Sequence, residues 1–206
     1  MPDATPIRAE PRPVARWAVA LIGAATVAAI VLIAFSVTRP EPQGFQPTAT
    51  AEPFPGTDDG SLRLTIDASS PDTWRFVSLA RGAVVSANDP WDLGFRRFHI
   101  MANGGAGFSG TAAIADLGPI PFHAATIPAD SAFRVTAAAA DSTNPAIDRW
   151  YRYGFSSHLL MPLDRTYVVR GHAGTHYALR IAGYYCPRAQ PGCMTIRYLP
   201  LHAPDP

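Results

Sequence analysis

The chain has 206 residues and a formal net charge of +1 at pH 7, and all 17 of its Lys and Arg residues are arginine. Charges balanced in this way give no clustered basic face, which argues against a nucleic-acid partner. Residues 61–206 are long enough for one domain with a hydrophobic core and too short for two.

The first predicted element is a membrane helix. Residues 17–37, WAVALIGAATVAAIVLIAFSV, contain no charge and no proline. A helix of this length reaches roughly 31 Å, the thickness of the hydrocarbon core of a bilayer. The tail before it, residues 1–16, is proline-rich and carries three arginines. The positive-inside rule therefore predicts a bacterial inner-membrane protein with a cytoplasmic tail and a periplasmic C-terminal part.

A cleaved signal peptide is the alternative, with Ala34 and Ser36 as the small residues of a cleavage site. The apolar run is longer than the roughly 7–15 residues of the hydrophobic region of a signal peptide, which favours an uncleaved anchor. The C-terminal part is exported under either interpretation.

The predicted membrane helix carries a stripe of small residues at helical spacing: Ala20, Gly23, Ala24 and Ala28. Such a stripe lets a second membrane helix approach closely. An alanine-rich sequence produces the same pattern by composition alone. The stripe is therefore either a helix-packing surface or a consequence of composition, and the sequence does not decide between them.

Residues 38–60 contain five prolines and predict a stiff, extended linker. After the linker, short apolar stretches between turn residues predict strands at 61–67, 73–79, 82–87, 91–102, 166–172, 175–185 and 193–201. Asn144 and Pro145 precede AIDRWYRY and predict one short helix, with Asn144 as its cap. The expected domain, residues 61–206, is mostly β with one short helix.

The two cysteines, Cys186 and Cys193, both lie in the exported part, with two prolines and a glycine between them. An oxidising compartment favours a disulfide between them. A metal site is the alternative, and it would need two more ligands nearby.

Two blocks of the sequence resemble a known family. Residues 91–110, WDLGFRRFHIMANGGAGFSG, are similar to the Trp-Asp-Leu-Ala-Phe-Arg-Arg…Asn-Gly-Gly stretch of the HmuY family, and residues 167–199 follow the order of its second block. The aromatic segment 72–85 is also where that family has a strand. The resemblance spans about residues 62–200 and implies two packed antiparallel sheets, export and no enzymatic activity.

The same resemblance implies a ligand, because named members of the family bind haem through two histidines and pass it to an outer-membrane uptake system. Those members are lipoproteins or secreted, whereas this chain has a predicted spanning helix. Bis-histidine ligation needs two histidines on opposite sides of an apolar slot. His123 follows Pro-Ile-Pro-Phe and His158 precedes Leu-Leu-Met, so these two are the candidate haem ligands. Half-buried histidines bonded to backbone would give the same pattern.

Other patterns in the sequence carry less chemistry. His172 and His176 flank a turn and could bind a metal ion, but an ordinary surface hairpin would give the same residues. Residues 105–110 match G-x-G-x-x-G, but glycine and proline interrupt the next segment, which favours a turn over a dinucleotide site. Ser157, His158 and Asp164 suggest a hydrolase, yet the G-x-S-x-G elbow is missing.

Trp91 and Asp92 open the first family block. We expect Trp91 to fill the core, with a partner for its N–H group. Asp92 is expected to cap backbone groups or to pair with Arg96 or Arg97. Both residues are therefore predicted to be determinants of the fold.

Two functions follow from the sequence. The first is a non-enzymatic accessory subunit of a larger inner-membrane complex, with integral membrane proteins and lipid as partners. A domain of this type on a single span also looks similar to an accessory polypeptide of some bacterial photosynthetic reaction-centre and antenna complexes. The alternative is a membrane-tethered haem-binding protein; no other cofactor is implied.

Overall fold

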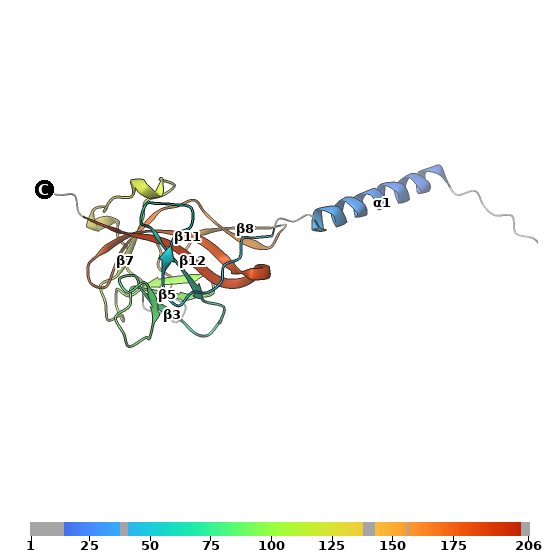
Figure 1. The fold of residues 1–206 in the computed structure, drawn as a ribbon. Coiled ribbons are helices and arrows are strands. Elements are labelled where there is room, and N and C mark those ends of the chain that lie inside the picture. Colours follow the sequence, from blue (N-terminus) through green and yellow to red (C-terminus); the bar gives the residue numbers. More distant parts are fainter. Residues whose placement is uncertain (1–14, 38–40, 138–142, 156, 203–206) are drawn as a thin grey trace, which may run out of the picture. The chain divides into compact units, whose positions relative to one another are not determined.

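The computed structural model describes residues 15–37, 41–137, 143–155 and 157–202. The chain divides after residue 40 into two compact units. The first contains α1 (Arg16–Val37), a helix of 22 residues (Figure 1). Its segment Arg16–Ala34 is long and apolar enough, by length and composition, to cross a membrane. The predicted helix is confirmed, and its spanning and its orientation stay predictions.

The second unit is built on a six-stranded antiparallel sheet. In spatial order its strands are β1 (Glu52–Pro53), β2 (Leu62–Asp67), β12 (Gln190–Leu201), β11 (His176–Cys186), β10 (Tyr167–Arg170) and β7 (Ala113–Asp116). The long β11 and β12 form the central hairpin, which Figure 1 shows in orange to red.

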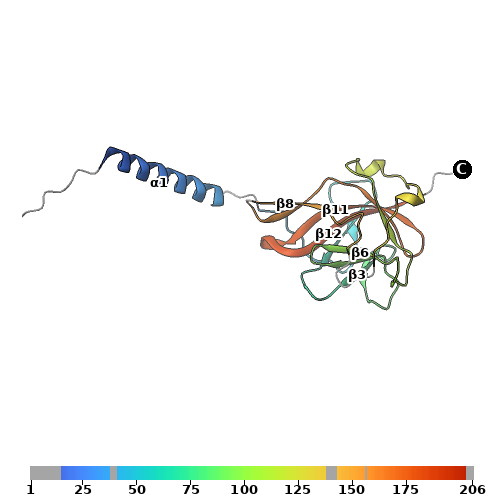
Figure 2. The ribbon, with the colours of Figure 1, turned by 180° about the vertical axis from the view of Figure 1, so that it is seen from behind.

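A four-stranded antiparallel sheet packs against the first. Its order is β4 (Ala83–Val85), β3 (Arg75–Ser78), β5 (Leu93–Arg96) and β6 (His99–Ala102). Figure 2 shows this sheet from the other side. A separate hairpin consists of β8 (Tyr151–Gly154) and β9 (Leu159–Pro162). The described part of the domain also contains three 3-10 turns: η1 (Phe122–Ala124), η2 (Asp130–Ala132) and η3 (Pro187–Ala189).

One hydrophobic core joins the two sheets. Its fully buried side chains come from both, among them Leu64, Val77, Phe95, Ile100, Leu179 and Ile196. In β2, Leu64 and Ile66 lie two residues apart and therefore project from the same face of the strand, as the alternating sequence predicts. The expected fold, mostly β with two packed antiparallel sheets, is confirmed.

The linker is shorter than the predicted 38–60, because the second unit begins at Glu41. The Phe45 N–H donates to the carbonyl of Tyr185 at 2.8 Å, and β1 pairs with β2. An extended segment beside a sheet edge satisfies its own backbone groups and those of the edge. Residues 41–60 are thus part of the domain.

The predicted strand 91–102 is two strands. β5 and β6 pair across a two-residue connection, Arg97–Phe98, in which Arg97 has a φ of 53°. Hairpin turns of this length require a positive φ, which glycine or asparagine usually supplies. The sequence carries neither residue there, so the turn gives no local signal.

The prediction of a short helix after Asn144 is wrong. Asn144 does accept a hydrogen bond from the Ala146 N–H at 3.0 Å, as a cap would, but residues 145–149 form turns and β8 follows. Trp150 is fully buried and donates its Nε1–H to the carbonyl of Phe98 at 2.9 Å. This packing, with the pairing of β8 and β9, overrides the local preference.

The predicted disulfide is confirmed. Cys186 and Cys193 are bonded, with their Cα atoms 4.9 Å apart. The bond joins the end of β11 to β12 across η3. It therefore closes the loop end of the central hairpin.

Candidate functional site

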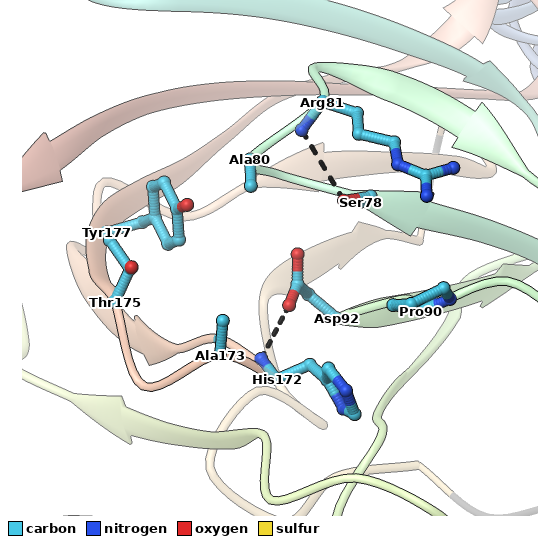
Figure 3. Close-up of a pocket in the computed structure, with 10 residues that line it drawn as sticks. Ser78, Ala80, Arg81, Pro90, Asp92, His172, Ala173, Thr175 and Tyr177 are labelled. Atoms are coloured by element: carbon cyan, nitrogen blue, oxygen red, sulfur yellow. Dashed lines mark hydrogen bonds between the residues drawn. The ribbon is translucent and has the colours of Figure 1, made fainter.

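A pocket of about 160 Å³ lies where turns from the two sheets meet. Three segments form its wall: the end of β3 with the turn after it, the residues before β5, and the β10–β11 turn with the start of β11 (Figure 3). Its polar lining comprises Ser78, Arg81, Asp92, His172, Thr175 and Tyr177. The family block at 91–110 thus contributes to this pocket directly.

Asp92 connects the two sheets at the floor of the pocket. It is 5% exposed. Its Oδ2 accepts the Leu79 N–H at 2.7 Å, just after β3, and its Oδ1 accepts the His172 N–H at 2.6 Å, in the β10–β11 turn. Hydrogen bonds to an ionised acceptor are stronger than neutral ones. Asp92 therefore has the predicted capping role, and these backbone donors take the place of the expected arginine partners.

Asn103 and its neighbours hold the Trp-Asp pair in place. The Asn103 N–H donates to the carbonyl of Asp92 at 2.9 Å, and its side-chain amide donates to the carbonyl of Trp91 at 2.9 Å. At Gly104 a Cβ would lie 2.0 Å from the carbonyl oxygen of Ala112, so only glycine fits. Trp91 is buried, with its ring 4.7 Å from that of Phe76. Trp91 and Asp92 thus act as the predicted determinants of the fold, and a partner for the Trp91 N–H group stays a prediction.

Gly171 lets the β10–β11 turn approach the carboxylate. A Cβ at this position would lie 2.9 Å from Oδ1 of Asp92. The turn closes with the Gly171 N–H donating to Thr175 O at 2.7 Å, which confirms the predicted hairpin turn. Figure 3 shows the imidazole of His172 turned away from Asp92 while its backbone N–H points toward it.

Two polar atoms beside the pocket are buried and have no hydrogen-bond partner among the described residues, Nδ1 of His172 and the hydroxyl of Tyr198. The Tyr198 ring packs edge-on against that of Tyr177, 6.1 Å between centroids. Burial raises the pKa of Tyr198 to about 12 and also raises the pKa of Tyr177. Both phenols are therefore neutral at pH 7, and the orphaned atoms favour a water molecule or a small polar ligand as partner.

The structure does not bring the two candidate haem ligands together. His123 lies exposed on η1, which packs on Ala178, whereas His158 lies exposed in the β8–β9 turn. The hairpin contacts the other end of β11, where the Leu160 N–H donates to the Tyr185 hydroxyl at 2.7 Å. Ala178 and Tyr185 are seven residues apart, about 23 Å along a strand. One iron cannot bind both histidines in this arrangement.

His158 has a local partner, because its Nδ1 lies 2.5 Å from the Tyr153 hydroxyl across the hairpin. Asp164 pairs instead with Arg180, and Ser157 bonds within the β8–β9 turn. No catalytic triad is formed by Ser157, His158 and Asp164 through these contacts. A haem site that uses only one of these histidines is a different hypothesis from the predicted pair.

The remaining sequence patterns are turns. His172 lies in the β10–β11 turn and His176 begins β11, and no cluster of three metal-ligating side chains occurs among the described residues. Residues 105–110 form turns, with φ of 111° at Gly105 and 87° at Gly107.

The small residues of α1, Ala20, Gly23, Ala24 and Ala28, lie exposed on the isolated helix.

The pocket does not fit an enclosed haem. His172 is the single histidine of its lining, and bis-histidine ligation needs two. Its volume of about 160 Å³ is also below the roughly 300–1,000 Å³ of pockets that enclose drug-sized ligands. The pocket is suited to water or to a small polar molecule.

Sequence reasoning missed Ser78 and Tyr177 as pocket residues. Both sit in strands whose pattern predicts pairing and packing only. Gly171 beside His172 is the one local hint, because a glycine between a strand and a turn often marks close backbone approach.

Comparisons with known proteins match the β-domain. The family model of the HmuY protein matches residues 70–198. A Bacteroides vulgatus structure described as HmuY-like and haem-binding has 19% identity, a TM-score of 0.55 and coverage of 73% of this chain and 96% of its own. The apo HmuY analogue of Tannerella forsythia has 14% identity, a TM-score of 0.55 and coverage of 69% and 96%.

A Bacteroides fragilis structure described as a lipoprotein has 17% identity, a TM-score of 0.54 and coverage of 72% of this chain and 94% of its own. At these identities the likeness concerns the fold. The chain has no match among curated protein sequences.

Proposed function

The chain belongs to the HmuY family, and from that premise we propose that it is a non-enzymatic binding protein held at the inner membrane by α1, with its β-domain in the periplasm. The extent of the family match, residues 70–198, carries the proposal. The long apolar α1 supports the tether. The disulfide supports export, because disulfides persist in oxidising compartments such as the periplasm.

Haem is the first ligand to test, because a solved structure with a similar fold is described as HmuY-like and haem-binding. The exposed His123 and His158 favour binding at the surface through one of them, outside the Asp92 pocket. When bound, haem would supply iron that accepts an imidazole nitrogen. The chain would supply that nitrogen and apolar surface for the ring, such as the half-buried Leu159 beside His158.

The test is a titration of the full-length protein in detergent with haemin, followed by the Soret band. A saturable shift at one equivalent supports the proposal, and single variants His123→Ala and His158→Ala should assign the ligand. His202→Ala is the matched control, because His202 is also exposed but follows the last strand. Absence of a saturable shift would remove haem as the ligand, and a shift unchanged in both variants would remove these two residues.

The accessory-subunit role is a second candidate, favoured by one observation. The small residues Ala20, Gly23, Ala24 and Ala28 lie exposed on α1, and a Cβ added at Gly23 would have nothing within 4 Å. Such a surface suits a neighbouring membrane helix. Purification from native membranes in mild detergent should then yield a stoichiometric complex, and a free monomer would count against this role. Nothing in the comparisons points to photosynthesis, so a reaction-centre or antenna partner stays a prediction.

A further inference from the structure

The β8–β9 hairpin exposes apolar side chains. Phe155, at its tip, is 87% exposed and Tyr153 50%, and Met161, opposite Arg152 toward the base, is 43% exposed. Two exposed arginines, Arg149 and Arg152, lie within or just before the hairpin, and residues 149–163 contain no acidic residue. Aromatic side chains with arginines are typical of protein surfaces at the membrane–water interface.

The hairpin extends along β11 toward the disulfide end of the domain. At its base, Leu163 shares a cavity wall with Arg180 and Ile181. Nearer the tip, the Leu160 N–H donates to the Tyr185 hydroxyl at 2.7 Å. The tip therefore projects beyond Tyr185, and in Figures 1 and 2 it lies at the same end of the domain as the turn between β11 and β12.

The chain from α1 enters the domain at this same end. The Phe45 N–H donates to the carbonyl of Tyr185 at 2.8 Å, and Gly44 forms a bridge with Tyr185. Tyr185 thus contacts both the entering chain and the hairpin. Only residues 38–40 lie between α1 and Glu41, and a connection of that length spans at most about 14 Å.

We propose that the tip of the β8–β9 hairpin, led by Phe155 with Tyr153 beside it, inserts into the interface of the bilayer that α1 spans. The short connection keeps the domain entry near the membrane surface, and the apolar tip gains by leaving water. The inference rests on the proposed membrane tether and is independent of the ligand.

The contact orients the domain. The Asp92 pocket includes Tyr177, near the opposite end of β11 from Tyr185, and eight residues of strand correspond to about 26 Å. With the hairpin tip in the interface, the pocket lies near the end of β11 that is farther from the membrane. This second point of attachment, besides the helix, also restricts rotation of the domain about its connection.

Single spin labels on the full-length protein test this. Both native cysteines are in the disulfide, so an introduced cysteine is unique. We would label Phe155→Cys, with Val135→Cys as the matched control, because Val135 is also exposed (48%) but lies outside the hairpin. Val27→Cys in α1 reports the tether separately. Each variant is reconstituted in vesicles of phosphatidylcholine and phosphatidylglycerol, and collisions with oxygen and with a water-soluble nickel chelate are compared.

The expected result is loss of nickel-chelate access at positions 155 and 27, with oxygen access retained, and full nickel-chelate access at position 135. If the label at 155 behaves like that at 135 while the label at 27 is immersed, the hairpin contact is refuted and the tether stands. If the label at 27 is also open to the chelate, the tether fails and the inference with it. Shielding at 155 in native membranes alone would assign the tip to a protein partner and overturn the lipid contact.

Discussion

Replacing Asp92 with alanine should destabilise the domain more than replacing any exposed carboxylate. The Asp92 carboxylate accepts the backbone N–H groups of Leu79 and His172, one from each sheet. Hydrogen bonds to a charged group contribute about 1.5–3 kcal/mol each, so the pair contributes about 3–6 kcal/mol. Water in the adjoining pocket can replace part of this, and we expect a loss of about 3 kcal/mol at the lower end of that range.

A loss of that size should lower the Tm by about 6–12 °C for a domain of this length. The measurement is thermal unfolding of the full-length protein in detergent, followed by near-UV circular dichroism of the aromatic core. Asp92→Asn retains one acceptor oxygen, so its Tm should fall about half as far as that of Asp92→Ala. It also keeps the prediction testable if the alanine variant does not fold.

Asp130→Ala is the control, because Asp130 is 92% exposed and pairs with Arg170 at 3.3 Å. An exposed ion pair contributes about 0–1 kcal/mol. If Asp92→Ala melts within about 2 °C of the wild type, or no lower than the control, the carboxylate does not hold the sheets together and the reasoning is refuted.

Three further predictions concern the core and the central hairpin. The double variant Cys186→Ser, Cys193→Ser should be less stable by about 2–3 kcal/mol in chemical denaturation, and a reduced wild-type protein of unchanged stability would contradict this. Tyr198→Phe removes a hydroxyl that has no partner among the described residues, so this variant should be neutral or stabilising by about 1 kcal/mol. Tyr185→Phe removes the acceptor of the Leu160 N–H and should lower the stability by about 1 kcal/mol. Equal losses of stability in both variants would refute these hydrogen-bond assignments. Burial raises the pKa of Tyr198 from 10.0 to about 12. The stability that the neutral phenol contributes to the fold is therefore complete below pH 10 and is lost as the pH rises toward 12. In alkaline melts, the Tm of Tyr198→Phe should accordingly decline less with pH than that of the wild type.

The strands were predictable where the sequence alternates on a half-buried surface. Residues 61–67 predicted β2 because Leu64 and Ile66 face one core. Residues 91–102 read as one strand because nothing local marks the turn at Arg97, whose positive φ is imposed by the pairing of β5 with β6 and by the Arg97 N–H donating to Ala68 O at 2.7 Å. Non-local contacts of this kind leave no trace in a short window.

The pocket was beyond prediction for the same reason. Asp92 was recognised as a fold determinant, yet its two donors lie 13 and 80 residues away along the chain. Both are backbone groups, which every residue type carries. Side-chain identity therefore could not reveal which turns would meet at the carboxylate.

The histidines show how apolar neighbours mislead. Apolar residues flank His123 and His158 in the sequence, which favours them as ligands, but those neighbours take the interior positions: Phe122 is buried on η1, and Leu160 packs against the core. The adjacent histidine is then directed outward in a tight turn, where successive side chains cannot share one face. Apolar neighbours in a loop thus indicate an anchored turn as readily as a ligand slot. The contacts of the two turns with β11, at Ala178 and at Tyr185, show that the turns lie at different ends of the same strand.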